Sequence, residues 1–119
     1  MTSNPTSADC VFCRIVAGQV PARKVYETAT VLAFHDASPR APTHILIIPK
    51  KHIARLADMS NGDAALMGDL MLAARDVAAQ EGVSDGFRLV ANNGASSGQS
   101  VFHVHLHLLA GRHMAWPPG

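Results

Sequence analysis

The stretch VFHVHLHLL, residues 101–109, alternates histidine with apolar residues near the end of the chain. Successive side chains of a β-strand point to opposite faces, so this alternation predicts a strand that carries His103, His105 and His107 on one face. The apolar side chains of the other face pack into the core and fix the register, because a slip by one residue would bury three imidazoles instead. We expect this strand to cover residues 101–111.

Three histidines on one face have three interpretations. They can be surface residues of a strand that tolerates histidine. Two of them can be ligands of a catalytic metal ion, although an extended strand keeps all three from reaching the same ion. One neutral imidazole can also attack phosphorus while its neighbours orient it or move protons. The preceding loop NNGASSGQS, residues 92–100, favours the last interpretation, since its glycines let backbone N–H groups approach an anion closely.

The pattern of the remaining sequence predicts an α+β domain. We expect a short helix over residues 11–18 and one long helix over residues 60–82, with Ser60 as N-cap and Asp63 completing a capping box. The expected strands cover residues 24–27, 30–36, 44–50, 86–92 and 101–111, and they form an antiparallel five-stranded sheet. One apolar stripe of the long helix is expected to fill the core: Leu66, Met67, Leu70, Met71, Ala74, Val77 and Ala78.

Composition limits the classes of function. The chain has 119 residues, of which 48% are apolar and 16% charged, and this is typical of one compact domain. Its net charge of +1 and its dispersed basic residues argue against extended nucleic acid as a partner. Neither a signal peptide nor an apolar run of about 18–20 residues is present, so we expect a cytoplasmic protein with no membrane partner. In a reducing compartment Cys10 and Cys13 indicate a metal site or a redox pair sooner than a structural disulfide.

The blocks LAFHDASPRAPTHILIIPKKHI, GQSVFHVHLHLL and WPPG resemble, in this order, the histidine triad (HIT) nucleotide-binding family. The triad signature is His-φ-His-φ-His-φ-φ, with φ apolar, and residues 103–109 match every position. Gln99 and the closing WPPG are similar to the Hint branch rather than to the dinucleoside polyphosphate hydrolases of the same superfamily. The resemblance implies a single HIT domain over residues 10–119, preceded by a flexible tail over residues 1–9.

The resemblance also implies an activity. Hint proteins are homodimers with one sheet continued across both subunits, and they hydrolyse purine nucleoside phosphoramidates without a catalytic metal. The middle histidine, His105 here, would attack the α-phosphorus and form a nucleotidyl-histidine that water then hydrolyses. His107 matches the histidine that contacts the phosphate and assists proton transfer, and His103 matches the position that orients the nucleophile.

The substrate-binding positions also follow from the resemblance. Asp36 matches the carboxylate that holds the ribose hydroxyls, and Trp116 matches a residue that reaches toward the partner's active site. Phosphate-loop positions are Asn92, Gly98, Gln99 and Ser100. Base-pocket positions are Phe12, Ile15, Phe34 and His35.

Several bacterial relatives hold a structural zinc ion at a Cys-x-x-Cys pair. The matching ligands here are Cys10, Cys13, His44 and His103, a closed set that would attach the N-terminal helix to the sheet. The alternative is a pair of thiols without metal. His35, His52 and His113 are expected at the pocket edge or the surface.

Two rival functions remain at this stage. One is a nucleotide-binding module without catalytic activity, and the other is a dinucleoside polyphosphate hydrolase. AMP release from adenosine 5′-phosphoramidate distinguishes the phosphoramidase from the binding module.

Overall fold

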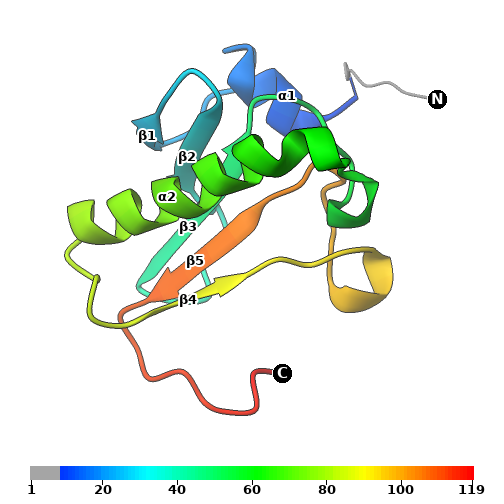
Figure 1. Ribbon diagram of the computed structural model, residues 1–119. Coiled ribbons are helices and arrows are strands. Elements are labelled where there is room, and N and C mark those ends of the chain that lie inside the picture. The colour runs from blue at the N-terminus through cyan, green and yellow to red at the C-terminus, as the bar shows by residue number, and fades with distance from the viewer. Residues whose placement is uncertain (1–8) are drawn as a thin grey trace.

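The computed structural model describes residues 9–119 and consists of one five-stranded sheet with a helix on each face (Figure 1). The sheet has the order β1-β2-β3-β5-β4, and every neighbouring pair is antiparallel. The elements are α1 (Val11–Val16), β1 (Lys24–Glu27), β2 (Val31–His35), β3 (Thr43–Pro49), α2 (Ala64–Gln80), β4 (Phe87–Val90) and β5 (Leu106–Ala110), with short 3-10 turns at Leu56–Asp58, Asn61–Asp63 and Ala95–Ser97. This confirms the predicted fold class and the predicted order of elements.

The central strands are apolar without alternation because both of their faces are covered. Along β2, Val31 and Ala33 belong to the core under α2, whereas Leu32 and Phe34 pack on the other face with Phe12 of α1. Strand β3 is similar: Ile45 and Ile47 face α2, whereas Leu46 and Ile48 face α1. A strand buried on both faces reads as a continuous apolar run, which is the pattern of residues 45–48.

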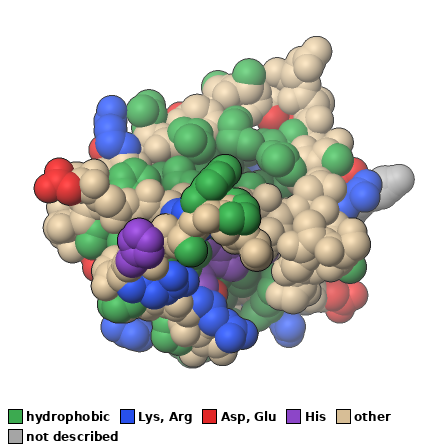
Figure 2. Space-filling model, turned by 90° about the horizontal axis from the view of Figure 1, so that it is seen from below, with side chains coloured by type: hydrophobic (Ala, Val, Ile, Leu, Met, Phe, Trp, Pro, Cys, Tyr) green, Lys and Arg blue, Asp and Glu red, His purple; other side chains and the backbone are tan. Residues whose placement is uncertain are grey.

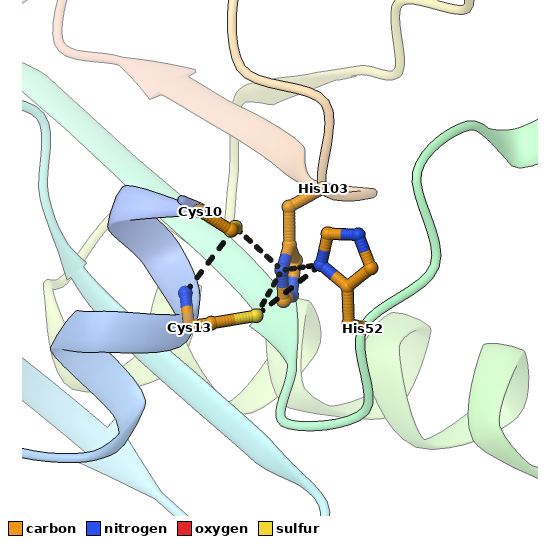
Figure 3. A group of neighbouring side chains, drawn as sticks. All are labelled: Cys10, Cys13, His52 and His103. Carbon is orange, nitrogen blue, oxygen red and sulfur yellow. Dashed lines mark hydrogen bonds between the residues drawn. The ribbon is translucent and has the colours of Figure 1, made fainter. Parts of the chain in front are cut away.

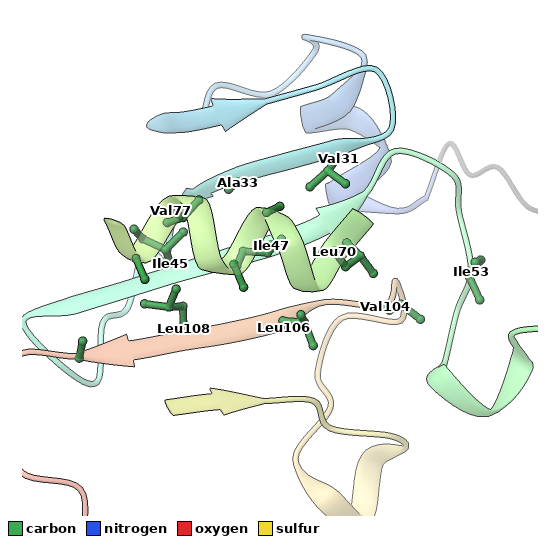
Figure 4. Close-up of a cluster of buried hydrophobic side chains, with 14 residues drawn as sticks. Val31, Ala33, Ile45, Ile47, Ile53, Leu70, Val77, Val104, Leu106 and Leu108 are labelled. Carbon is green, nitrogen blue, oxygen red and sulfur yellow. The ribbon is translucent and has the colours of Figure 1, made fainter. Parts of the chain in front are cut away.

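The larger core lies between α2 and the sheet (Figure 4). Leu70 and Val77 of α2 meet Ile45 and Ile47 of β3 and Leu108 of β5, and all five side chains are completely buried. At about 25 cal/mol per Å² of apolar surface, such burial is the main stabilising contribution to the fold. The smaller cluster around α1 forms the floor of the cavity described below.

The long helix begins where the predicted capping box of Ser60 and Asp63 places it. The backbone N–H of Ser60 donates to the Asp63 carboxylate at 2.9 Å, which is the capping-box contact predicted for this pair. The box caps the 3-10 turn Asn61–Asp63, and α2 continues from it at Ala64. Lys51 adds an ion pair to the Asp63 carboxylate at 2.7 Å. This lysine and this hydrogen bond hold the pKa of Asp63 below its usual range.

The predicted stripe of α2 is wrong at one position. Met71 was expected in the core, but its side chain is 48% exposed, and the neighbouring Leu72 is 52% exposed. The small residue Ala73 takes the buried position instead. Alanines at 73, 74 and 78 bring the helix close to the sheet, which turns the long side chain of residue 71 outward.

The predicted strand over residues 101–111 is also wrong in its first half. Strand β5 begins only at Leu106, and residues 101–105 form an irregular segment. The backbone N–H of Val104 donates to the carbonyl of Ile53, which lies outside the sheet. Strand pairing therefore begins only at Leu106, but the predicted alternation of faces already holds before it. Val104 packs in the core under α2, whereas the rings of His103 and His105 contact Phe12 of α1 on the opposite face.

Residues 1–8 of the predicted flexible tail lie outside the described residues. Within residues 9–119, no helix combines the length and the apolar character needed to cross a membrane.

Candidate active site

A cavity of about 900 Å³ opens on the sheet face that carries α1. Its walls come from α1, from β2 and the following loop, from the glycine-rich loop and from the end of the histidine stretch. In the space-filling view, histidine side chains lie at a hollow, with Lys and Arg side chains gathered beside them (Figure 2).

The cavity brings together most of the residues predicted to bind substrate. Its lining includes Phe12, Ile15, Phe34, His35, Asp36, Asn92, Gly98, Ser100, His105 and His107. Three predicted residues do not line it: Gln99, Trp116 and His103. Trp116 lies in the C-terminal segment and is 82% exposed.

An apolar end of the cavity is formed by aromatic contacts. The ring of Phe12 packs edge-on against Phe34 at 5.5 Å between centroids and against His105 at 5.2 Å. Edge-to-face contacts of this kind are a favoured arrangement of aromatic rings and orient both partners. The same contact limits the rotation of the His105 ring.

The tautomer of His105 follows from its hydrogen bond. Its Nδ1 lies 2.7 Å from the main-chain carbonyl of His103, and a carbonyl oxygen only accepts. Nδ1 therefore carries the proton, and Nε2 of the neutral ring has an available lone pair. The ring is only 8% exposed and lines the cavity, so this lone pair is a nucleophile protected from bulk water.

His107 is held by a short chain of hydrogen bonds. The backbone N–H of Arg40 donates to Nδ1 of His44 at 2.9 Å, so a neutral His44 carries its proton on Nε2. This Nε2 lies 2.9 Å from Nδ1 of His107, which accepts, and His107 keeps its own proton on Nε2. The cavity wall thus presents an N–H donor from His107 beside a lone pair from His105, with 4.9 Å between their ring centroids.

Burial keeps this chain of histidines neutral. Burial, together with the neighbouring His105 and His44, lowers the pKa of His107 to about 4, against the opposing charge of Asp36. Burial also lowers the pKa of His44, although Asp36 raises it. Both rings are therefore hydrogen-bonding groups rather than charges at pH 7.

Asp36 provides the carboxylate of the cavity. One of its oxygens accepts from the backbone N–H of Ser38 at 2.7 Å, and the other lies 3.3 Å from Nε2 of His44. Because carboxylate oxygens accept more than one hydrogen bond each, Asp36 can still receive hydroxyl donors from a ligand. Its position beside His44 connects it to the chain that holds His107.

The glycine-rich loop is supported by Gln99 from behind. The buried Gln99 amide donates to the carbonyls of Ala54 and Val101, and its oxygen accepts from the backbone N–H of Gly94. These bonds turn its side chain away from the cavity, so the prediction that Gln99 binds substrate directly is corrected to a supporting role. Within residues 9–119, no acceptor is bonded to the hydroxyl of Ser100, which faces the cavity. Gly98 allows the loop to turn there at a φ of +104°.

A second group of side chains could bind a metal ion: Cys10, Cys13, His52 and His103 (Figure 3). Sγ of Cys10 and Sγ of Cys13 lie 3.4 and 3.5 Å from Nδ1 of His103, and Nδ1 of His52 lies 3.2 Å from the same atom. One ligand atom from each of these four residues lies within 4.8 Å of the others. His103 is completely buried, and its Nε2 donates to the carbonyl of Pro49 at 2.8 Å. Its Nδ1 lone pair therefore points at the cysteines and not into the cavity.

The predicted fourth member of this cluster was His44, and that prediction is wrong. His44 lies at the beginning of β3, whereas the contact with His103 is made by Pro49 at the end of the strand. Five residues of strand separate these ends by roughly 16 Å. His52, just beyond the end of β3, takes the fourth position instead of lying at the surface as expected.

The sequence analysis thus missed the parts played by His44 and His52. His44 and His52 lie at the two ends of the run that forms β3. The sequence does not show which of these ends lies beside the cysteines. Arg23 and Arg40, which line the cavity as well, were also not singled out. One signal in the sequence could have separated His44 from the cysteine site: the expected strand is long enough to keep His44, at its beginning, far from cysteines that meet its end.

Comparison with known proteins identifies the family. The model of the HIT domain matches residues 17–114. An uncharacterized HIT-like protein of Synechocystis is 51% identical over 111 residues, which cover 93% of this chain and 97% of that protein. A second one, from Synechococcus elongatus, is 49% identical over 113 residues and covers 95% and 99% of the two chains.

Solved structures agree with these sequence matches. A HIT family hydrolase from Legionella pneumophila has a TM-score of 0.91 at 50% identity, over 93% of this chain and 100% of that chain. A histidine triad protein from Clostridium difficile has a TM-score of 0.89 at 39% identity, over 93% and 97%. A domain match over most of the chain, with relatives at about half identity, establishes that this protein belongs to the HIT family.

Proposed function

We propose that the protein is a purine nucleoside phosphoramidase that acts through His105. The observation that carries the proposal is the hydrogen bond between Nδ1 of His105 and the carbonyl of His103, because it selects the tautomer whose Nε2 lone pair is available beside the cavity. A lone pair fixed in direction and shielded from water is what nucleophilic catalysis at phosphorus needs. The resemblance to Hint proteins supplies the substrate class.

The reaction has two steps. Nε2 of His105 attacks the α-phosphorus of adenosine 5′-phosphoramidate, the new P–N bond forms as the bond to the leaving amine breaks, and nucleotidyl-histidine results. Water then attacks the same phosphorus, AMP is released, and Nε2 regains its lone pair. No oxidant, reductant or metal ion takes part in either step.

The leaving amine must gain a proton as it departs, and His107 is the group placed to give it. The ring is neutral in the free protein, since burial lowers its pKa to about 4. A bound phosphate anion beside the ring raises that pKa, because an opposite charge favours the imidazolium. The N–H of His107 and the hydroxyl of Ser100 also stabilise negative charge on the phosphoryl oxygens.

The remaining parts of the cavity suit a purine nucleoside. The aromatic end around Phe12 and Phe34 offers stacking for a base, and Asp36 accepts hydrogen bonds from the ribose hydroxyls. The glycine-rich loop with Gly98 lies where the phosphate would be held.

We also propose a structural zinc ion, with Cys10, Cys13, His52 and His103 as ligands. Two thiolates and two imidazoles are the donor set that zinc prefers, and four protein ligands leave no open position for catalysis. The carbonyl of Pro49 fixes the proton of His103 on the nitrogen away from the cluster, as second-sphere groups do at zinc sites. The ion would attach α1, and therefore the base end of the cavity, to the end of β3.

A homodimer is part of the proposal. The sheet ends in two edge strands, β1 and β4, and a sheet continued across two subunits would pair one of these edges with its copy. The exposed Trp116 is then available to reach the partner's cavity. Sedimentation equilibrium tests this, and a monomer at micromolar concentration would contradict it.

The activity is tested by incubating the protein with adenosine 5′-phosphoramidate and measuring AMP. The wild type is expected to release AMP, and His105→Asn is expected to lose at least about a thousandfold in kcat/KM. His113→Asn is the matched control, since this histidine is exposed and does not line the cavity. No release by the wild type would favour a nucleotide-binding module, and equal release by His105→Asn would exclude His105 as the nucleophile.

A further inference from the structure

The basic residues of the chain divide into two groups. All three lysines, together with Arg55 and Arg75, form ion pairs with carboxylates. The other five are arginines, and among the described residues none of them has a carboxylate partner: Arg14, Arg23, Arg40, Arg88 and Arg112. Cations without a partner are candidates for binding an anionic ligand where they gather around a cavity.

Two of these arginines, Arg23 and Arg40, line the same cavity as Asp36. The carbonyl of Arg23 accepts from the backbone N–H of His35, the residue before Asp36. The backbone N–H of Arg40 donates to His44, whose carbonyl accepts from the backbone N–H of Asp36. Both arginines are thus one hydrogen bond away from the segment that holds the Asp36 carboxylate, and both side chains are exposed to solvent.

The backbone of Arg40 lies on the far side of His44 from His107. Its N–H donates to Nδ1 of His44, whereas His107 contacts Nε2 on the other side of the same ring. The proposed position of the α-phosphate is beside His107 and His105, so the guanidinium groups of Arg23 and Arg40 are available to a different anion.

The main chain of Arg40 is also fixed at its other end. Its carbonyl accepts from Nε of Arg112 at 3.0 Å, which brings a third guanidinium to the same rim. Arg112 lies just after β5, and its own Nη1 donates to the carbonyl of His113. The backbone of this rim is held by hydrogen bonds, and the side chains of Arg23 and Arg40 are exposed cations, an arrangement that suits a dianion with several acceptor oxygens.

We propose that Arg23 and Arg40 form a second anion subsite at the ribose end of the cavity, for a phosphate on the 2′ or 3′ oxygen of the nucleotide. The inference rests on the proposed function, since it uses Asp36 as the ribose contact. With one ribose oxygen phosphorylated, the other hydroxyl still donates to Asp36, and the added phosphate lies between the two guanidinium groups. The preferred substrates are then nucleoside 5′-phosphoramidates that carry this additional phosphate.

The test compares the binding of AMP with that of adenosine 3′,5′-bisphosphate and adenosine 2′,5′-bisphosphate by isothermal titration calorimetry. For the wild type at low salt, at least one bisphosphate is expected to bind about tenfold more tightly than AMP, a gain modest enough for solvent-exposed charges. In the double variant Arg23→Gln/Arg40→Gln, the ratio of the two affinities is expected to fall to about one. Arg14→Gln is the matched control, because it removes an exposed, unpartnered arginine that does not line the cavity.

The outcomes separate the subsite from the proposed function. AMP binding with no advantage for either bisphosphate would overturn the subsite and leave the proposed function standing. An advantage that persists in the double variant would also overturn it. If neither AMP nor a bisphosphate binds the wild type, the subsite and the proposed nucleotide cavity fail together.

Discussion

The main-chain carbonyl of His103 accepts a hydrogen bond from His105, while the ring of His103 faces two cysteines. One residue therefore contributes to two neighbouring sites through different atoms. In the proposed mechanism the backbone carbonyl of His103 orients the nucleophile, whereas its imidazole lies in the cluster with His52. Conversely His44, a residue outside the triad, contacts His107 directly.

Buried neutral histidines make the stability of the metal-free protein depend on pH. Burial lowers the pKa of His107 to about 4 from an ordinary value of 6.5, so the folded protein resists a proton that the unfolded chain accepts. The unfolded state binds more protons below pH 6.5, and stability therefore falls as pH decreases from about 6.5 to about 4. The slope is about 1.4 kcal/mol per pH unit for each such proton.

This dependence is measured by urea unfolding between pH 7.5 and pH 4.5 in the presence of a chelator. His107→Asn should flatten the slope, whereas His113→Asn, which removes an exposed histidine, should leave it as in the wild type. Equal slopes for the wild type and His107→Asn would contradict a neutral His107 in the folded state.

At the scale of elements, the alternating histidines predict the two faces of the segment correctly but not the residue at which strand pairing begins. Strand β5 pairs with β3 only from Leu106 onward, although Val104 already packs in the core under α2. Before it, the ring of His103 turns to Cys10, and the backbone of Val104 bonds to Ile53. These partners come from segments 51 to 93 residues away, which no local pattern encodes.

The same reasoning explains the other outcomes. The capping pair Ser60 and Asp63 and the apolar run of β3 act locally, and both were predictable. The exposure of Met71 depends on how closely α2 approaches the sheet, which is a tertiary property. Most cavity residues were assigned through the family resemblance, whereas His52 required the actual end of β3.

Zinc binding should distinguish His52 from His44. His52→Ala is expected to lower the zinc content of the purified protein well below one ion per chain, because it removes one of four ligands. His44→Ala is the matched control and should keep its zinc, since His44 contacts His107 and Asp36 instead. Elemental analysis of both variants gives the answer.

Removal of the ion by a chelator should also lower the thermal midpoint of the wild type, because binding to the folded state stabilises it. A wild type that purifies with intact cysteines but less than about 0.2 zinc per chain would contradict the proposed site.

At the scale of the whole molecule, α2 covers one face of the sheet (Figures 1 and 4), and the cavity lies on the other face. The main core belongs to the first face, and the proposed active site to the second. Leu108 and His107, adjacent on β5, point to these opposite faces.

This division predicts separable effects. Leu108→Ala removes a completely buried side chain and should lower the free energy of unfolding by about 2–5 kcal/mol. Met71→Ala should change it by less than about 0.5 kcal/mol, because Met71 is largely exposed. Chemical denaturation of both variants measures the difference, and equal losses would contradict the assignment of the core.

The central claim, nucleophilic attack by His105, is tested most directly by trapping the intermediate. The protein is mixed with adenosine 5′-phosphoramidate, quenched within the first turnover, digested, and mapped by mass spectrometry. We predict an adenylyl group on the peptide of the wild type that contains the triad, attached to His105 and absent from His105→Asn. An adenylyl group on His107, or one that forms equally in His105→Asn, would contradict the account.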